Sequence, residues 1–207
     1  FQVGIRDVFL IEEPMAAAIG SDLPIEMPKG NMVIDIGGGT TEVAIISLSA
    51  TAYSESLRVA GDELDEAIIR YLQKKYQVAI GYIAAERIKI EAASVLPMEH
   101  QGDPISIVGK DMFTGIPKNL KISRDEVREA IDEPVSAIID SIKRALEKLP
   151  PEFVSDLDET GMVLTGGGAM LKGLNKRIEE ETGIRVRITD DPLFSVVLGA
   201  GRALEDM

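Results

Sequence analysis

The sequence contains no cysteine and only one histidine among its 207 residues. Without cysteine, the chain can form neither a disulfide framework nor a thiolate metal site, which is compatible with a reducing cytosol. His100 lies in a polar loop, MEHQGDP, without acidic partners at the spacing of metal ligands, so we expect it to face solvent. A metal site built from several His or Cys side chains is therefore excluded.

Basic residues are also in deficit, because 22 Lys and Arg stand against 35 Asp and Glu, a formal net charge of -13. Proteins that bind the phosphate backbone over a broad surface present clustered Lys and Arg, so we do not expect nucleic acid as a partner. No apolar run approaches the roughly 20 residues that span a bilayer, and the start does not resemble a secretory signal. We therefore expect a soluble chain located in the cytoplasm.

The chain opens on Phe1 rather than Met, directly before the strand-like run DVFLI at residues 7–11. Such a start is unusual for a native protein, so we expect a fragment or a processed product. With 45% hydrophobic residues, the chain can form one substantial core or two small ones that share a cleft.

The order of the expected elements predicts an α/β fold of the RNase H type. Three strands come first, at residues 32–36, 43–47 and 52–57. A block of helices and small strands follows, and an α-β-α-β-α series closes the chain. This order predicts a mixed five-stranded sheet with a small α/β subdomain inserted after the third strand.

Local patterns place the ends of several helices. Pro14 can occupy the first turn of a short helix, and Asp62 can cap a second helix. Ser123 and Glu126 form a capping box, whereas Pro134 should break or kink the helix that follows. The other expected elements are helices at residues 83–95, 171–181 and 194–204, strands at 162–164 and 186–188, and small strands and hairpins within 98–122.

Three consecutive glycines separate two apolar strands in VIDIGGGTTEVAII, residues 33–46. Asp35 ends the first strand and Thr40 and Thr41 begin the next, so the turn leaves backbone N–H groups and two hydroxyls pointing outward. These donors suit a phosphate tail, and Asp35 could hold the water shell of a divalent cation. The pattern is neither a P-loop nor a dinucleotide fingerprint, because no lysine is present and a strand follows. An ordinary glycine hairpin stays open as the alternative.

A second triplet, Gly166 to Gly168, lies in MVLTGGGAML, residues 162–171. Here the strand leads into a helix, whose N-terminus carries partial positive charge. Glycines at this place would let a flat or bulky ligand lie against the backbone. Together the two loops indicate that one binds phosphates and the other supports a nucleoside.

Five motifs in this order resemble the nucleotide-binding motifs of the actin, Hsp70 and hexokinase superfamily, and within it the MreB family of bacterial actins. They are EEPMAAAIG, VIDIGGGTTEVAII, AERIKIE, VLTGGGAMLKGL and LGAGRAL. The resemblance covers essentially the whole chain, including KNLKISRDEVREAI and DEPVSAI at residues 118–138. It matches only the second half of such a protein, domains IIA and IIB, without the first phosphate loop.

This resemblance implies an actin-like ATPase fold with three parts. Residues 1–30 would be the end of domain I and a crossover helix, residues 31–60 with 134–207 would form subdomain IIA, and residues 61–133 would form the inserted subdomain IIB.

The resemblance also implies ATP and Mg²⁺ as cofactors and a role for each site residue. Glu13 would position or activate the water that attacks the γ-phosphate, Thr40 would help to place this water, and Asp35 would orient hydrated magnesium. The implied phosphate-binding residues are Gly37, Gly38, Gly39, Thr40 and Thr41, the implied ribose and adenine contacts are Gly61, Asp62, Glu86 and Lys89, and the implied adenosine loop is Gly166, Gly167 and Gly168.

Several of these residues have a simpler interpretation. Glu13 could be an acidic residue that satisfies a helix N-terminus. Glu86 and Lys89 are spaced i,i+3 and could form a surface ion pair. The acidic pairs at residues 158–159 and 190–191 belong most simply to loops and caps rather than to a metal site.

The function implied by the resemblance is that of an ATP-dependent cytoskeletal protein whose filaments determine cell shape and guide cell-wall synthesis. Exposed loops around Met112, Phe113 and Ile116 are candidates for contacts between subunits, unless they fold back onto their own hairpin. The implied partners are further copies of the chain and the cell-elongation and cell-wall synthesis proteins at the inner membrane. Filaments would lie at the cytoplasmic face of the membrane, with membrane contact only through the absent domain I.

Three alternatives stay open. A sugar or acetate kinase of the same superfamily would need an acceptor base in the missing half. A chaperone-type ATPase would need a substrate domain after Leu204, and the chain could also serve only as a binding module for partner proteins. ATP hydrolysis is expected of the complete protein and not of this chain alone, because half a cleft cannot enclose a nucleotide.

Overall fold

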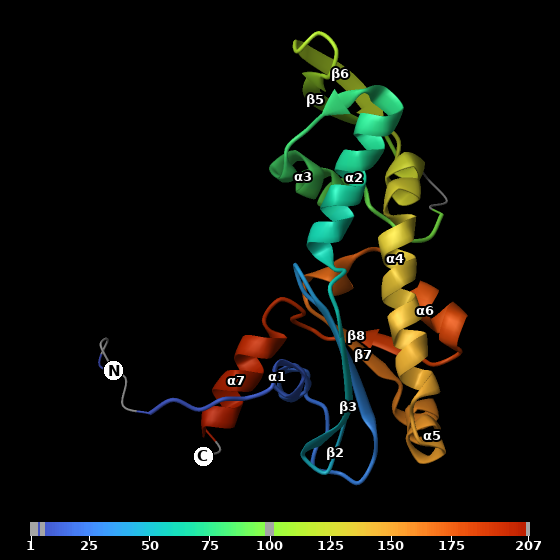
Figure 1. The fold of residues 1–207 in the computed structure, drawn as a ribbon. Coiled ribbons are helices and arrows are strands. Elements are labelled where there is room, and N and C mark those ends of the chain that lie inside the picture. The colour runs from blue at the N-terminus through green and yellow to red at the C-terminus, as the bar shows by residue number, and fades with distance from the viewer. Residues whose placement is uncertain (1–3, 5–6, 98–101, 206–207) are drawn as a thin grey trace.

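A mixed five-stranded sheet forms the centre of the larger part of the molecule (Figure 1). The computed structural model describes residue 4 and residues 7–97 and 102–205. The strand order is β3-β2-β1-β7-β8, in which β3, β2 and β1 pair antiparallel and β1, β7 and β8 pair parallel. The predicted sheet is therefore confirmed. Its strands are β1 (Asn31–Ile36), β2 (Thr41–Ser47), β3 (Ala50–Leu57), β7 (Met162–Thr165) and β8 (Val186–Ile188).

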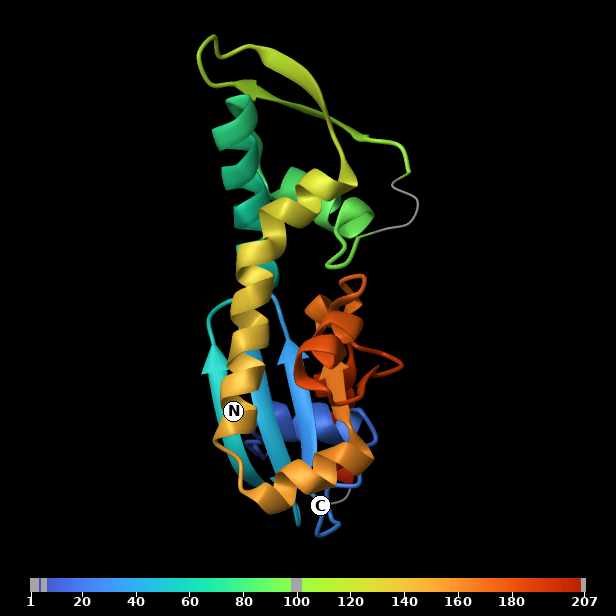
Figure 2. The same cartoon turned by 90° about the vertical axis from the view of Figure 1, so that its right-hand side faces the viewer.

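Helices cover both faces of this sheet (Figures 1 and 2). One face carries α1 and α7, and the other carries α4, α5 and α6. No helix within the described residues is long and apolar enough to cross a membrane. The covering helices are α1 (Glu13–Gly20), α4 (Arg124–Glu147), α5 (Pro151–Thr160), α6 (Leu174–Thr182) and α7 (Ser195–Glu205).

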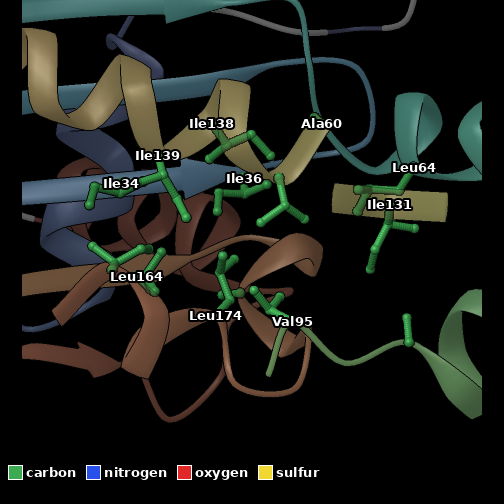
Figure 3. Packing of buried hydrophobic residues seen from close by; sticks show 14 of the residues in the cluster. Ile34, Ile36, Ala60, Leu64, Val95, Ile131, Ile138, Ile139, Leu164 and Leu174 are labelled. Atoms are coloured by element: carbon green, nitrogen blue, oxygen red, sulfur yellow. The ribbon is translucent and has the colours of Figure 1, made fainter. Parts of the chain in front are cut away.

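Strand β1 is buried along its whole length, because side chains from both faces pack between helices. Ile34 and Ile36 belong to the larger hydrophobic cluster, beside residues of α4 such as Ile138 (Figure 3). Val33 packs instead in a smaller cluster with Ala17 of α1. Since strand side chains alternate between faces, Asp35 points to the same face as Val33, which is the α1 face.

The helices α1 and α7 cross closely, because each presents a glycine at the crossing. A Cβ atom on Gly20 would overlap the backbone of Ser195, and one on Gly199 would overlap the carbonyl of Ala16. Two arginines donate hydrogen bonds to backbone carbonyls at the C-terminal end of α1. Arg202 donates to Ile19 O at 2.8 Å, and Arg187 donates to Ser21 O at 3.2 Å. The crossing therefore fixes α1, and with it Glu13 at its start.

A smaller sheet with strand order β4-β5-β6 lies at one end of the molecule, beside α2 and α3 (Figure 1). The hairpin of β5 and β6 agrees with the small strands expected between residues 98 and 122. The residue limits of the subdomains stay a prediction, and α4 crosses the expected limit at residues 133–134 without interruption. The elements are α2 (Gly61–Tyr76), β4 (Val78–Ala79), α3 (Tyr82–Ala92), β5 (Ile105–Asp111) and β6 (Pro117–Ile122).

Prolines lie in two of the helices that cover the larger sheet. The capping box of Ser123 and Glu126 begins α4 as predicted, and α4 continues through Pro134, so of the predicted break or kink the break does not occur. A proline removes a single N–H donor, and the buried packing of Pro134 offsets this loss. Figure 2 shows the first turns of α4 inclined to the rest, which agrees with a kink. Pro151 occupies the first turn of α5, a helix that we did not predict.

Two predicted helix starts are wrong. Ala60, not Asp62, is the N-cap of α2, and Asp62 is an acidic residue of its first turn. The second glycine triplet leads first into a short 3-10 helix, η1 (Gly167–Met170), so α6 begins at Leu174 and not at residue 171. The expectation that His100 faces solvent lies outside the described residues.

Candidate functional site

Asp35 is a buried carboxylic acid at the end of β1. Its side chain packs so closely against Gly166 that a Cβ atom on Gly166 would overlap Asp35 Oδ1. Asp35 is 5% exposed. Burial, followed by the nearby charges of Glu13 and Glu42, raises the pKa of Asp35 from 3.8 to about 6. A carboxylate in such surroundings gains most from a cation, because none of the groups that shift its pKa is positive.

Glu13 is the first residue of α1, and its charge acts on Asp35 across the end of the sheet. The neighbouring Glu12 is held by the structure, since Thr51 Oγ1 donates to Glu12 Oε2 at 2.7 Å. Within the described part of the chain, no hydrogen bond or ion pair holds the exposed carboxylate of Glu13. Its place in the first turn of α1 also fits the simpler role of an acid at a helix N-terminus.

The first glycine loop, Gly37 to Gly39, connects β1 to β2 in a tight turn closed by Gly37 N–H donating to Thr40 O at 2.9 Å. None of these glycines has a positive φ. A Cβ atom would meet nothing closer than 3.4 Å at Gly37, 3.6 Å at Gly38 and 3.9 Å at Gly39. The protein itself therefore has room for side chains here, unlike at an ordinary glycine hairpin that needs positive φ. Close approach of a ligand is the remaining physical reason for three glycines.

Backbone donors of this loop are available to a ligand. The carbonyls of Gly37 and Gly38 accept from the N–H groups of Gly61 at 3.1 Å and Asp62 at 2.8 Å. Among the described residues, the N–H groups of Gly38, Gly39 and Thr40 donate to no backbone acceptor. Three successive free donors are the arrangement that binds anions such as phosphate.

The two threonines after the loop differ. Thr40 is partly exposed, whereas Thr41 is fully buried and its hydroxyl donates to Val59 O at 2.8 Å. We expected both hydroxyls to point outward, and for Thr41 this is wrong. Successive side chains of an extended chain point to opposite sides, so Thr41, the first residue of β2, points toward the protein, where its hydroxyl hydrogen needs a partner.

The start of α2 lies against the glycine loop. A Cβ atom on Gly61 would come within 3.3 Å of Gly37 O, and one on Gly38 would come within 3.6 Å of Asp62 Oδ1. Gly61 is buried and Asp62 is exposed. The structure therefore places two of the four predicted ribose and adenine contacts beside the predicted phosphate loop.

Glu86 and Lys89 of α3 do not form the surface ion pair that we considered. Lys89 Nζ lies 2.8 Å from Asp65 Oδ2 and 2.9 Å from Gly61 O, while Glu86 is exposed. Glu86 lines an open hollow of about 410 Å³ together with Asp62, Asp65, Glu66, Tyr82 and Ile83. This hollow collects carboxylates that could accept hydrogen bonds from ligand hydroxyls.

The second glycine loop, Gly166 to Gly168, lies next to the first because β7 pairs parallel with β1 and aligns Thr165 with Asp35. Gly166 has φ +81, and a Cβ atom on it would overlap Asp35 Oδ1 and Ile36 O. A Cβ atom on Gly168 would overlap the Ile36 side chain. Packing thus explains these two glycines without a ligand. Gly167 is exposed and Gly166 and Gly168 are partly exposed, so the predicted adenosine loop is most open at Gly167.

Three residues near this site were not predicted. Glu42 aligns with Asp35 across the β1–β2 pair, Asp65 follows Gly61 by one helical turn, and Leu193 lies 3.3 Å from the Cβ position of Gly167. The spacing of Asp65 could have placed it beside Gly61, but its partner Lys89 lies on another helix and was not predictable.

A magnesium site made by protein ligands alone is absent from the described residues, since no cluster of three or more His, Cys, Asp or Glu occurs there. Mg²⁺ usually binds one or two carboxylates together with phosphate oxygens and waters. The buried Asp35 beside the free donors of the glycine loop fits this mode of binding. The contact of Asp35 to magnesium through water stays a prediction.

The whole chain, residues 1–207, matches the family model described as MreB/Mbl protein. The cell shape-determining protein MreB of Escherichia coli (strain K12) is 50% identical over 202 residues, which are 98% of this chain and 58% of that protein. The cell shape-determining protein Mbl of Bacillus subtilis (strain 168) is 42% identical over 204 residues, which are 99% of this chain and 61% of that protein. The chain therefore spans less than two thirds of these curated relatives.

Solved structures show the same fold. MreB5 of Spiroplasma citri bound to AMPPNP has a TM-score of 0.94 and 34% identity, with 99% of this chain and 62% of that chain covered. The MamK double helical filament has a TM-score of 0.77 at 23% identity, with 95% and 59% covered, and shows a shared fold only.

The sheet order, the inserted smaller sheet and the two adjacent glycine loops define an actin-like ATPase fold, and the similarity to MreB5 confirms it. Within that class, the chain belongs to the MreB/Mbl family. Family membership confirms the predicted resemblance and does not favour the kinase or chaperone alternatives.

Proposed function

We propose that the full-length protein binds and hydrolyses MgATP at this site and assembles into filaments that determine cell shape. The observation that carries the proposal is the first glycine loop, where glycines that the fold does not require present three free N–H donors beside the buried Asp35. This combination suits a polyphosphate with its divalent cation. MreB5 has been solved with AMPPNP and with ADP, which supports a nucleotide as the ligand.

The residues of the chain would divide the work. The N–H groups of Gly38, Gly39 and Thr40 bind phosphate oxygens, and Asp35 holds the hydrated cation. When bound, Mg²⁺ neutralises charge on the phosphates. The free carboxylate of Glu13, whose charge acts on Asp35, would orient the attacking water or accept its proton.

Self-association uses the tip of the β5–β6 hairpin. Met112, Phe113 and Ile116 are 51%, 82% and 62% exposed, so they do not fold back onto their own hairpin. Apolar side chains at a loop tip gain from burial in a second molecule. Filaments at the cytoplasmic face of the membrane would then organise the proteins that synthesise the cell wall. The names of the cell shape-determining relatives support a role in cell shape.

The test measures nucleotide binding, phosphate release and pelleting of the full-length protein with and without MgATP, with electron microscopy of the pellet. We expect filaments that respond to nucleotide. The variant Glu13→Ala should bind MgATP like the parent and release phosphate at least about a hundredfold more slowly. Glu12→Ala is the matched control, because Glu12 is engaged by Thr51 and should keep normal turnover. Equal turnover in Glu13→Ala and the parent would remove Glu13 from the mechanism, and a parent that does not bind MgATP would refute the proposed function.

A further inference from the structure

The carboxylate of Asp65 lies between the two helices that carry the implied nucleoside contacts. We propose that Asp65 is a positioning residue of the nucleotide site, which holds Lys89 so that Lys89 fixes the backbone of Gly61 and, through it, the phosphate loop at Gly37 and Gly38. This inference rests on the proposed function, because it assigns the loop to phosphates. It gives Lys89 a role through the loop instead of the direct ribose or adenine contact that the resemblance implies.

The first part of the chain of contacts joins α3 to α2. Lys89 Nζ donates to Asp65 Oδ2 at 2.8 Å and to Gly61 O at 2.9 Å. The side chains of Lys89 and Asp65 are 18% and 8% exposed. In such surroundings the ion pair is stronger than at the surface, and either charge would be costly to leave alone.

The second part joins α2 to the phosphate loop. Gly61 N–H donates to Gly37 O at 3.1 Å, and Asp62 N–H donates to Gly38 O at 2.8 Å. Lys89 therefore binds the carbonyl of Gly61, and the N–H group of the same residue binds the glycine loop. Within the described residues, these are the backbone contacts from outside the turn that fix Gly37 and Gly38. A shift of Gly61 would move the free N–H groups that follow these carbonyls.

Lys89 has limited capacity for a ligand. An ammonium group has three N–H donors, and Asp65 and Gly61 already accept two. Asp65 Oδ1 is buried without a hydrogen-bond partner. Lys89 is therefore the group that compensates the negative charge of this carboxylate. Both facts describe a cross-link inside the protein, while the exposed Glu86 on the same helix keeps its carboxylate open to the hollow.

The experiment separates a contact to phosphates from a contact to the base. The full-length protein and its variants are titrated with MgATP and with magnesium tripolyphosphate, which has no nucleoside, by displacement of a fluorescent ADP analogue. Asp65→Asn and Lys89→Met should weaken both ligands by the same factor, roughly tenfold, the lower end of the loss seen when an orienting residue is removed. Glu86→Gln should weaken MgATP only, and Glu91→Gln, an exposed residue of α3, should weaken neither.

Loss of stability needs its own control, because removing one partner of a buried pair leaves an unpaired charge. The double variant Asp65→Asn/Lys89→Met removes both charges, so its thermal midpoint should return toward that of the parent. If the pair positions the loop, the affinity for tripolyphosphate stays low in this variant. Recovery of both stability and affinity would show a purely structural pair and overturn the proposal.

The other outcomes are also decisive. Weaker MgATP binding with unchanged tripolyphosphate binding in Lys89→Met would show a direct nucleoside contact and overturn the proposal. Unchanged binding of both ligands in Asp65→Asn would do the same while leaving the proposed function intact. A parent protein that binds neither ligand would refute the proposed function itself, and with it this inference.

Discussion

At the scale of single residues, the fold accepts a cost at Asp35 that a purely structural sheet would avoid. An apolar residue of similar size would fit the buried end of β1, yet an acid stands there beside the charges of Glu13 and Glu42. Burial of a charge without a positive partner lowers stability. Such a cost is typical of residues kept for binding or catalysis.

This cost predicts how stability depends on pH. The pKa of Asp35 is raised to about 6 in the folded protein, so the folded state binds the proton of this carboxyl group more tightly than the unfolded chain does. The loss of stability caused by the charged carboxylate is therefore complete above pH 6 and disappears toward pH 4. At pH 7.5 the free energy of unfolding of Asp35→Asn should therefore exceed that of the parent by on the order of 2–3 kcal/mol, so the variant unfolds at higher urea concentration. At pH 4 the two proteins should differ little in stability. Urea unfolding at both pH values checks this.

The same variant should lose the Mg²⁺ dependence of nucleotide binding. Asp190→Asn is the control, because Asp190 is exposed and its substitution should change stability at neither pH. An Asp35→Asn variant that is less stable than the parent at pH 7.5 would mean that Asp35 is held by favourable contacts rather than strained by burial.

At the scale of elements, the two glycine loops need glycine for different reasons. Gly38 has ordinary backbone angles and room for a Cβ atom, so Gly38→Ala should stay within about 0.5 kcal/mol of the parent in stability. Its methyl group would lie where phosphates approach, so MgATP affinity should fall by about tenfold or more.

Gly166→Ala should give the opposite result, a loss of at least about 2 kcal/mol, because its φ is +81 and its Cβ would overlap Asp35 and Ile36. Thermal unfolding and nucleotide titration of both variants check the contrast. Equal loss of stability in the two would contradict it.

The crossing of α1 and α7 gives a second prediction for an element. Gly199→Ala would push the carbonyl of Ala16 away, so we expect a loss of about 3 kcal/mol and slower phosphate release through displacement of Glu13. Gly201→Ala in the same helix meets nothing within 4 Å and should stabilise the protein by up to about 1 kcal/mol. Unfolding curves of the two variants measure the difference, and a stable Gly199→Ala variant would show that α1 can slide.

At the scale of the whole molecule, the sequence allowed prediction of what depends on local pattern and spacing. Alternating strands, the capping box of Ser123 and the two glycine loops were identifiable because each has a pattern within a few residues. The inward hydroxyl of Thr41 and the pairing of Lys89 with Asp65 were not. These features depend on which distant segments pack together, and tertiary packing overrides local preference there.

The glycine loop lies against the start of α2, and the β5–β6 hairpin lies beyond the other end of this helix (Figure 1). Phe113, the most exposed apolar side chain of the hairpin tip, should therefore act in assembly without touching the nucleotide. Phe113→Asp places a charge where we propose burial between subunits, so we expect MgATP affinity like that of the parent and loss of pelleting at concentrations where the parent sediments. Asn119→Asp adds the same charge to an exposed position of β6 away from the tip and should pellet normally. Normal filaments from Phe113→Asp would move the subunit contact to another surface, whereas loss of nucleotide binding in that variant would show that the hairpin tip and the glycine loop are coupled.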